Sequence, residues 1–492
     1  MFFRSASGRL SAAPLPMALA VGLTALAACA PDLGPADKVR PIGDYAATRT
    51  FAKAQAAWPS PDWWTAYGDS QLTGLIERAL RNSPDLKAVQ ARLIQAQAQT
   101  EQASAGLFPS ATAKGSIEET GVKLNFPGTP AQIEQFLPSN AQPFTQLSAS
   151  VSYQLDFFGR NHAAVAAASS ASRAAGFELA AARLQLSTAV ATAYCNLIQA
   201  EADNDAAQEA ARLRESSNTL VADRLKNGLE TRAEYNQSDA ARQSGQVDLI
   251  GATGAVLEAK YALAALIGEG PDAELDLTPT AGLKTTPIGL PSNLAANLVG
   301  RRPDIAAARL RVEAAAQREK VARADFYPNI NLVGSAMALS ITPQDIFSHN
   351  IELLQAGPAV SLPLFDAGRL AGAARNARGE YQEAVANYDK AVVQALHEVS
   401  DAITIRQGAQ ESIDHAQRAA VASEDAYRLV TMRYKAGLTP YLTVLTSENA
   451  LVAARRQLND LRAQALGADV ALVRALGGGF DDSAPAAQQS KP

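Results

Sequence analysis

The chain has 492 residues, of which 47% are hydrophobic and 19% are charged, and its formal net charge is −5. This composition excludes a disordered chain and allows several ordinary domains or one large elongated fold. No cluster of Lys and Arg is present, so we do not expect nucleic-acid binding, which depends on concentrated positive charge.

The first 28 residues have the layout of a secretory signal. Arg4 and Arg9 precede an apolar run that ends in small residues immediately before Cys29. The run is too short for a membrane span, and the ending LAAC resembles a bacterial lipobox. That resemblance implies cleavage before Cys29 and its acylation, and the Ala30 that follows is typical of sorting to the outer membrane. The alternative is an ordinary signal followed by a chance cysteine.

The chain contains an internal duplication. Segments that begin at Pro84 and Pro303 align at a constant spacing of 219 positions, from a Pro-Asp pair to a Gly-Ser pair. Further along, the spacing is 209, and three pairs of segments align. They are VSYQLDFFGR with VSLPLFDAGR, RLKNGL with RYKAGL, and the ends of ALIG and ALGG, where Gly268 matches Gly477. A repeat of this length predicts two similar halves of one fold.

The predicted domains follow from these alignments. We expect a signal peptide at 1–28, a lipid-anchored linker at 29–68, a first repeat at 69–270, a second linker at 271–291, a second repeat at 292–478 and a disordered tail at 479–492. The ten-residue change in spacing falls on a Pro-, Asn- and Gln-rich stretch before Val151, which we expect to form a loop.

Each repeat is predicted to contain two helices and then two strands. The strands are expected at about 107–120, 144–157, 326–340 and 353–365. Along the second strand, apolar side chains alternate with a polar set: Ser148, Ser150, Ser152, Gln154 and Asp156. This length and alternation suit a strand of an outer-membrane barrel. The alternative is a pair of amphipathic hairpins that cover a soluble core.

A long helix is predicted after each pair of strands. From Arg160 to Arg224 and from Arg369 to Arg433 the sequence contains few Gly or Pro residues. About 65 residues would give a rod of roughly 100 Å. The second rod shows a seven-residue repeat, which indicates left-handed supercoiling. Its positions are Tyr381, Val385, Tyr388, Val392, Ala395 and Val399. Gly228 and Gly437 are suited to end the rods, and a returning helix follows each.

Four membrane strands cannot close a barrel, and an open edge in lipid leaves backbone groups without hydrogen bonds. The strands must therefore be shared between copies: two copies would give eight strands and three would give twelve. A twelve-stranded barrel is wide enough to leave a lumen, which the polar face of the strands would line. Beyond the signal, no apolar run of sufficient length predicts a helical membrane span.

The lipobox, the duplicated Pro-Asp helices, LFDAGR and RYKAGLTPYLTVL together resemble the outer-membrane factor family, the TolC-like efflux proteins. The likeness is strongest to their lipidated, NodT-type multidrug-efflux branch. It extends from PDWW at 61–64 to ALGGGF at 475–480. The resemblance implies a homotrimer whose chains share one twelve-stranded outer-membrane barrel, continued by a coiled-coil helical tube in the periplasm.

The same resemblance implies export of small molecules, together with a periplasmic adaptor (a membrane fusion protein) and an inner-membrane efflux pump. Two alternatives stay open. One is a duct for type I protein secretion, and the other is a periplasmic coiled-coil lipoprotein without a pore.

The resemblance also assigns roles to the two tips. Adaptor docking falls on Arg224, Lys226, Gly228, Leu229, Arg433, Tyr434, Lys435, Gly437 and Leu438. Relatives often carry an acidic gate residue shortly after the second tip, where this chain has Thr446. The gate is expected at Thr446, at Glu448, or near the first tip at Glu230 or Glu234.

The sequence gives no sign of catalysis. The four histidines, at 162, 349, 397 and 415, lack metal-ligand spacing, and no phosphate-binding glycine loop, nucleophile elbow or CxxC is present. We therefore expect no enzyme activity, no metal and no cofactor apart from a covalent lipid on Cys29.

Overall fold

The computed structural model describes residues 33–45, 57–120, 142–279, 294–340, 343–348 and 351–481. The predicted signal, Cys29, the loop at 121–141 and His349 lie outside these ranges, as do most of the second linker and of the tail. The chain divides into two compact units. Unit 1 comprises 1–38, 95–173 and 310–386, and unit 2 comprises 39–94, 174–309 and 387–492.

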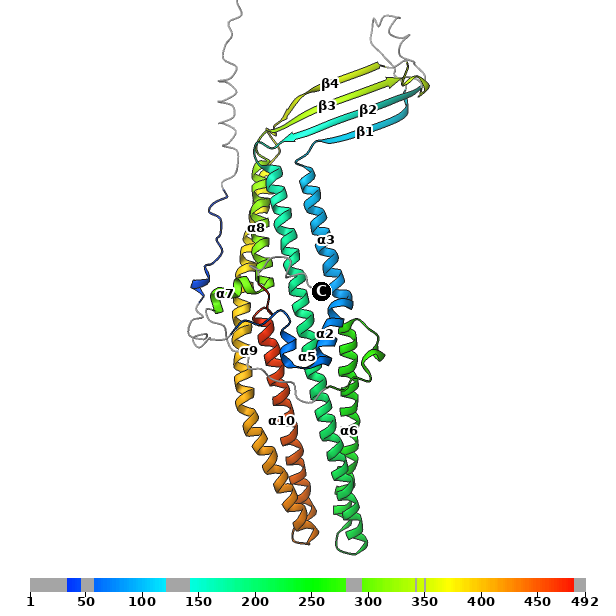
Figure 1. Cartoon of the computed structure of the whole chain (residues 1–492), viewed down its shortest axis with the longest axis vertical. Coiled ribbons are helices and arrows are strands. Elements are labelled where there is room, and N and C mark those ends of the chain that lie inside the picture. The colour runs from blue at the N-terminus through cyan, green and yellow to red at the C-terminus, as the bar shows by residue number, and fades with distance from the viewer. Residues whose placement is uncertain are drawn as a thin grey trace, which may run out of the picture. The chain divides into compact units, whose positions relative to one another are not determined.

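The helices and strands of the described residues follow the predicted duplication (Figure 1). The first half contains α2 (Ser70–Asn82), α3 (Pro84–Ala105), β1 (Ser110–Thr120), β2 (Gln142–Leu155), α5 (Arg160–Lys226) and α6 (Arg232–Ile267). The second half contains α7 (Leu294–Arg301), α8 (Pro303–Ala324), β3 (Asn329–Ser340), β4 (Ile351–Ser361), α9 (Arg369–Lys435) and α10 (Tyr441–Ala475). Short 3-10 helices are η2 (Ile42–Asp44), η3 (Trp63–Tyr67), η4 (Pro271–Glu274) and η5 (Pro343–Asp345).

The four strands form one antiparallel sheet in the order β1-β2-β3-β4. The β2–β3 pairing joins the two halves, with Thr145 opposite Ser340 and Leu155 opposite Ile330. β1 and β4 are the outer strands, and the described residues offer neither of them a second neighbour. The sheet therefore has two edges whose backbone groups have no partner within the described part of one chain.

A carboxylate caps the helix that follows β2 and another caps the helix that follows β4. β2 and β4 stop at Leu155 and Ser361, earlier than predicted. The Asp156 carboxylate accepts a hydrogen bond from the backbone N–H of His162 at 2.8 Å, in the first turn of α5. The Asp366 carboxylate likewise accepts from the N–H of Leu370 at 2.8 Å, at the start of α9. The placement of Asp156 on the polar strand face was wrong, because the unsatisfied N–H groups of a helix start attract its negative charge.

Within unit 1, ionic and aromatic contacts join the two halves below the sheet. Arg378 donates to Glu319 at 2.9 Å, and both side chains are almost fully buried. The ring of Phe158 stacks on that of Tyr327, with centroids 4.8 Å apart. These contacts bring α9 to α8, and the end of β2 to the start of β3.

Unit 2 has an aromatic core that includes part of the predicted linker. Trp63, Trp64 and Tyr67 of η3 are buried in a cluster with residues of α2, α5, α6 and α10. Asp69 caps α2 by accepting from the N–H of Leu72 at 3.1 Å, and it also accepts from the Tyr194 hydroxyl at 2.8 Å. The linker expected at 29–68 is therefore wrong at its C-terminal end, because three large aromatic side chains are too apolar to remain in solvent.

Earlier linker residues contact helix α9. The Tyr381 hydroxyl donates to the carbonyl of Asp37 at 2.9 Å in unit 1. In unit 2 the Tyr45 hydroxyl donates to the carboxylate of Asp389 at 3.2 Å. The first residues of the predicted tail are also packed, because the ring of Phe480 contacts that of Phe177 edge-on at 5.5 Å.

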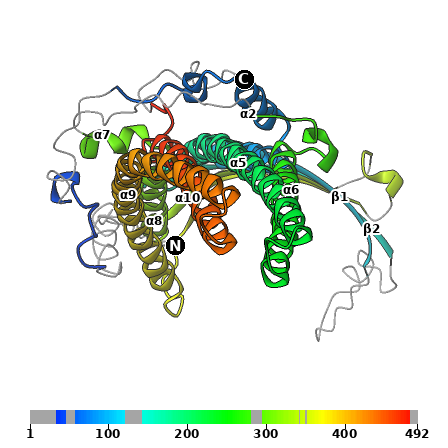
Figure 2. The same ribbon diagram turned by 90° about the horizontal axis from the view of Figure 1, so that it is seen from below.

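The two predicted rods are helices of 67 residues each, α5 and α9. The seven-residue repeat of α9 is confirmed as a buried stripe from Val385 to Val399, whereas Tyr381 is half-buried, and alanines continue the stripe at Ala402, Ala409, Ala416 and Ala420. Small residues in this seam allow close helix packing. Figure 2 shows α6 beside α5 and α10 beside α9. Ser238 of α6 donates to Asn218 of α5 at 2.8 Å, and Arg406 of α9 pairs with Asp469 of α10.

Helix α6 is long and apolar enough to cross a membrane by length and composition, although no such span was expected from the sequence. Only 22% of its most apolar window is buried within the chain. The helix also contains Lys260, whose ammonium donates to the carbonyl of Leu275 at 3.0 Å and lies 3.7 Å from Glu201 of α5. The ion pair with Glu201 joins α6 to α5, and the bond to Leu275 joins α6 to the segment after η4.

A tight backbone contact closes the first half. Gly268 caps α6 in the left-handed region at φ +81°, and a Cβ at this position would lie 2.9 Å from Cδ of Pro84. Gly477, its counterpart in the duplication, is also left-handed and lies against Arg301 and Arg302. The same contact between a returning helix and a Pro-Asp helix therefore occurs twice.

Gly268→Ala is expected to destabilise the protein by about 2 kcal/mol, because the left-handed backbone and the contact with Pro84 both disfavour a side chain. Thermal unfolding of the purified protein measures the loss. Gly467→Ala is the matched control: Gly467 is helical and no atom lies within 4 Å of a Cβ built there. Equal unfolding temperatures for the two variants would contradict the account.

Candidate functional site

The strand register defines the two faces of the sheet. Ser148, Ser150, Ser152 and Gln154 lie on one face of β2, together with Lys114 and Thr112 of β1. Leu147, Val151 and Tyr153 lie on the other face. The predicted division into an oily and a polar face describes β1 and β2. It is incomplete for β3, where the large apolar residues change faces between Leu332 and Val333.

Both long hairpins turn through the same capping motif. At the first tip, the N–H of Leu229 donates to the carbonyl of Arg224 at 2.8 Å and that of Gly228 donates to Leu225 at 3.0 Å. At the second, Leu438 donates to Arg433 at 2.9 Å and Gly437 to Tyr434 at 2.9 Å. This is a Schellman motif, which places a glycine in the left-handed region; φ is +72° at Gly228 and +74° at Gly437.

Two of the residues predicted to dock an adaptor instead hold the two tips together. The Arg224 guanidinium donates to Glu230 at 3.1 Å and to the Tyr434 carbonyl at 3.4 Å, and it lies 4.9 Å from the centre of the Tyr434 ring. Tyr434 is only 2% exposed and packs beside Tyr441. The docking prediction was wrong for Tyr434, because its ring is buried between the hairpins, and Arg224 is occupied by contacts within the chain.

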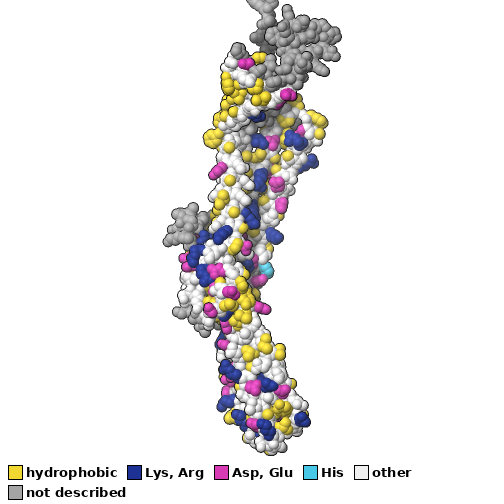
Figure 3. Space-filling view, turned by 90° about the vertical axis from the view of Figure 1, so that its right-hand side faces the viewer, with side chains coloured by type: hydrophobic (Ala, Val, Ile, Leu, Met, Phe, Trp, Pro, Cys, Tyr) yellow, Lys and Arg dark blue, Asp and Glu magenta, His cyan; other side chains and the backbone are white. Residues whose placement is uncertain are grey.

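The remaining tip residues are on the surface. Leu229 and Leu438 are 63% and 69% exposed. Lys226, Arg433 and Lys435 are also exposed, and Lys226 lies 3.3 Å from Asp223. The space-filling view shows basic, acidic and apolar side chains interspersed at the lower end, where the hairpin tips lie (Figure 3). Each tip therefore presents one exposed leucine with basic side chains nearby.

The gate prediction was wrong for Glu448. Its side chain is fully buried, and it accepts from Nε of Arg214 at 2.9 Å. Burial raises the pKa of the Glu448 carboxyl, and the Arg214 guanidinium opposes that rise. A carboxylate enclosed within one chain cannot contribute to a ring of charge that faces a pore.

Arg214 links three helices through this buried pair. From α5 it contacts Glu448 of α10 and lies 3.4 Å from Asp248 of α6. Gly245 of α6 makes room for it, because a Cβ there would lie 2.9 Å from Cδ of Arg214. Sequence reasoning missed Arg214, since its role appears only when three distant segments are brought together.

The other gate candidates have different environments. Thr446 is exposed, and its hydroxyl donates to the carbonyl of Leu442 at 2.8 Å. Glu230 is largely buried beside Arg224. Glu234 lies half-buried in the first turn of α6, where its N–H donates to Thr231 at 3.4 Å. Of the four candidates, Thr446 alone is exposed within the single chain.

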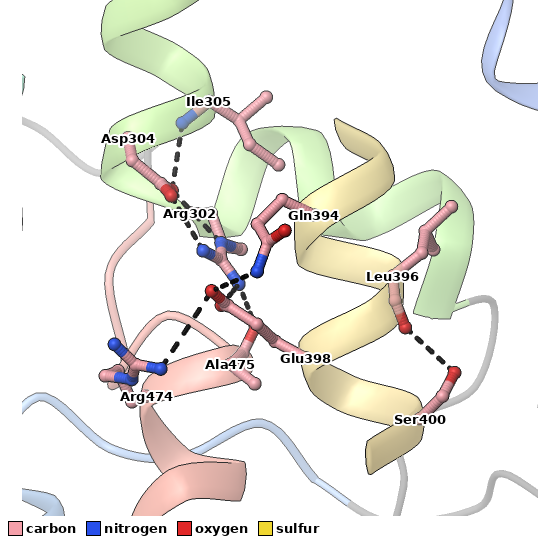
Figure 4. A network of polar contacts seen from close by, with 9 residues as sticks. All are labelled: Arg302, Asp304, Ile305, Gln394, Leu396, Glu398, Ser400, Arg474 and Ala475. Carbon is pink, nitrogen blue, oxygen red and sulfur yellow. Dashed lines mark hydrogen bonds and ion pairs between the residues drawn. The ribbon is translucent and has the colours of Figure 1, made fainter. Parts of the chain in front are cut away.

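A second buried arginine fixes the upper end of the second hairpin (Figure 4). Arg302 donates to Asp304 at 2.7 Å, to Glu398 of α9 at 2.8 Å and to the carbonyl of Ala475 at 3.2 Å. Burial disfavours its charge, but the two carboxylates hold the pKa of the guanidinium above its ordinary value. Glu398 thus has a structural role, because through Arg302 it joins α9 to α8 and α10.

Within the described ranges, no group of three or more His, Cys, Asp or Glu side chains could hold a metal ion. Cys195 is buried, and burial raises the pKa of its thiol to about 12. The features of the described residues that bear on function are the two-edged sheet, the paired tips and the buried ion pairs between helices.

A family model described as outer membrane efflux protein matches residues 75–269 and 294–478, which correspond to the two halves of the duplication. The chain belongs to the outer membrane efflux protein family. Its members act in the outer membrane as channels for efflux, and the family is not a class of enzymes. The predicted family, channel class and location are confirmed.

Relatives from several bacteria are similar over most of their length. The fusaric acid resistance protein FusA of Burkholderia cepacia is 30% identical over 452 residues, which cover 89% of this chain and 82% of FusA. The pyoverdine export outer membrane protein OpmQ of Pseudomonas aeruginosa is 31% identical over 425 residues, covering 85% and 87%. The outer membrane protein VceC of Vibrio cholerae is 37% identical with a TM-score of 0.78, covering 86% of this chain and 100% of VceC.

Arg214→Met is expected to destabilise the helical hairpins by about 3 kcal/mol, because Glu448 would lose its buried counter-charge. Thermal unfolding of the detergent-solubilised protein measures the effect, and adding Glu448→Gln should restore part of the loss. Arg212→Met is the control, since the Arg212 side chain is 73% exposed and its removal should leave the unfolding temperature unchanged. If Arg214→Met behaves like that control, the buried pair does not stabilise the hairpins.

Proposed function

We propose that three copies of this chain form one exit duct, which receives small molecules from an inner-membrane pump through a periplasmic adaptor. One observation carries the proposal: the described residues of this channel-family chain form a four-stranded sheet with two open edges. In hydrocarbon, each unpaired backbone group costs several kcal/mol, so each edge needs a strand from another copy. Three sheets give twelve strands, enough to enclose a lumen.

An apolar stripe on α6 supports association between copies. Val247 and Ile250 are 69% and 72% exposed, and Leu257 and Tyr261 are 39% and 42% exposed on the same helix. These residues recur at helical spacing, and contiguous apolar surface of this kind marks an interaction face. In a trimer, the stripe would pack against a helix of the neighbouring copy.

The tips are the proposed docking surface for the adaptor. Leu229 and Leu438 are exposed apolar side chains at the ends of both hairpins, close to Lys226, Arg433 and Lys435. A leucine flanked by basic side chains suits a partner with a small apolar contact and acidic residues around it. The rigid Schellman turns at Gly228 and Gly437 would present both leucines in fixed positions.

The cargo is proposed from the relatives. Their names refer to fusaric acid resistance, pyoverdine export and multidrug resistance, which favours small molecules over secreted proteins. The chain itself is proposed to have no enzymatic activity, with acylation of Cys29 as its only covalent addition. Mass spectrometry of the mature protein would show this lipid as a mass increase that a Cys29→Ser variant lacks.

Planar-bilayer recording tests the duct directly. The purified protein should conduct ions in discrete steps, and its detergent-corrected mass should correspond to three chains. A monomeric protein without conductance would overturn the proposal and favour a coiled-coil lipoprotein without a pore.

Leu229→Asp and Leu438→Asp are expected to reduce adaptor binding by about tenfold each, because a charge would replace an apolar contact at a tip. Binding of purified adaptor to the immobilised trimer measures this. Leu275→Asp is the control and should leave binding unchanged. Leu275 follows η4, and its side chain is 37% exposed. Equal binding by the tip variants and this control would place the adaptor contact elsewhere.

A further inference from the structure

The face of the sheet that carries Ser148 continues across all four strands. Directly opposed residues of an antiparallel pair lie on the same face. One row of opposed residues therefore contains Lys114, Ser148, Met337 and Leu353. The adjacent row on this face contains Ser116, Gln146, Leu339 and Ile351. At the same height, the face is polar on β1 and β2 and apolar on β3 and β4.

This face is the one that suits a lumen. Lys114 is the fifth residue of β1, and a lysine in the middle of a strand is costly against lipid, by roughly 2–4 kcal/mol at the bilayer midplane. The opposite face carries Leu147, Val151 and Leu354. It also carries Glu352 and Glu119, but the residues of β2 on it are apolar from Leu147 to Leu155, whereas those of β2 on the Ser148 face are polar from Gln146 to Gln154.

The apolar residues of the lumen face are exposed or half-buried in the single chain. Ile351 is 70% exposed and Leu353 is 42% exposed. Their cross-strand neighbours on β3, Leu339 and Met337, are half-buried. The pairs Met337–Leu353 and Leu339–Ile351 form a compact block of four side chains. We call this block the apolar wall.

We propose that the apolar wall contacts the cargo inside the barrel and selects amphipathic organic molecules over wholly polar ones. This inference rests on the proposed duct, because it needs the sheet to enclose a lumen. The neighbouring polar groups explain why the favoured molecules would be amphipathic and not wholly apolar. Lys114 is two strands from Met337, a distance of about 10 Å at ordinary strand spacing. A small molecule could place an apolar body on the wall and a polar end on the first hairpin.

Cysteine labelling tests the orientation of the wall, with two adjacent leucines as a matched pair. Leu353→Cys and Leu354→Cys place a thiol on opposite faces of β4. The charged reagent 2-sulfonatoethyl methanethiosulfonate is added during planar-bilayer recording. It should lower the conductance of the Leu353→Cys channel and leave that of Leu354→Cys unchanged. The native Cys195 is buried and Cys29 is proposed to carry the lipid, so wild-type protein should not respond.

Current block by two anions of equal charge tests the selectivity. Hexane-1-sulfonate should block the channel more strongly than methanesulfonate, because its chain can bury apolar surface on the wall. The double variant Met337→Ser, Leu353→Ser should weaken the hexane-1-sulfonate block by roughly tenfold and leave the methanesulfonate effect unchanged. The control Ala336→Ser, Leu354→Ser changes the opposite face and should retain the wild-type block.

The outcomes separate this inference from the proposed duct. Absence of conductance in every variant and in the wild type would overturn the duct itself. Normal conductance with labelling at Leu354→Cys instead of Leu353→Cys would overturn the orientation of the wall. Normal conductance with an unchanged hexane-1-sulfonate block in the wall variant, or with an equal loss in the control, would overturn the selectivity.

Discussion

The backbone hydrogen bonds of β1 and β4 are the constraint on which the rest of this molecule depends. The sheet has two open edges among the described residues, and hydrocarbon offers no water to satisfy them. A soluble protein can protect such edges with charges, bulges or a covering helix, whereas a membrane sheet must close. Sharing strands between copies meets that need, and the channel family to which the chain belongs provides the setting for it.

The junctions between strands and helices follow from the same constraint. A strand that leaves the membrane must pass into a structure whose first backbone donors are satisfied. Asp156 and Asp366 supply this by accepting hydrogen bonds from the first turns of α5 and α9. Further along, the pairs formed by Arg214 and Arg302 hold helices of both halves in place. Because these pairs are buried, loss of either partner leaves an uncompensated charge. The close packing around Arg214 also explains why the neighbouring residue of α6 is a glycine, Gly245.

The sequence was sufficient for features that repeat or are periodic. The duplication, the four strands, the 67-residue helices and the glycine tips all follow from spacing and local propensity. The buried stripe on α9 could also be predicted where Val and Tyr mark it. Its continuation through alanines could not, because alanine is common on every face of these helices.

Residues whose roles depend on distant partners were the ones misplaced. Glu448 and Tyr434 are charged or polar and lie near a predicted tip, so sequence position favoured a gate or docking role. In the structure both are buried by helices more than two hundred positions away. The mixed character of the face that carries Ser148, polar on β1 and β2 and apolar on β3 and β4, was equally unpredictable from the sequence. The large apolar side chains of β3 change faces at Val333, and only the register with β2 shows which face each of them joins.

The most direct test of the central claim is cross-linking of the two sheet edges between copies. Cys at Ala113 of β1 is combined in turn with Cys at Leu354 or Ala356 of β4, in outer membranes under mild oxidation. Shared strands predict disulfide-linked trimers for the pair that is in register, and no such products from either single substitution. Monomers at every pairing tried along both edges, from protein that is folded in the membrane, would contradict the account.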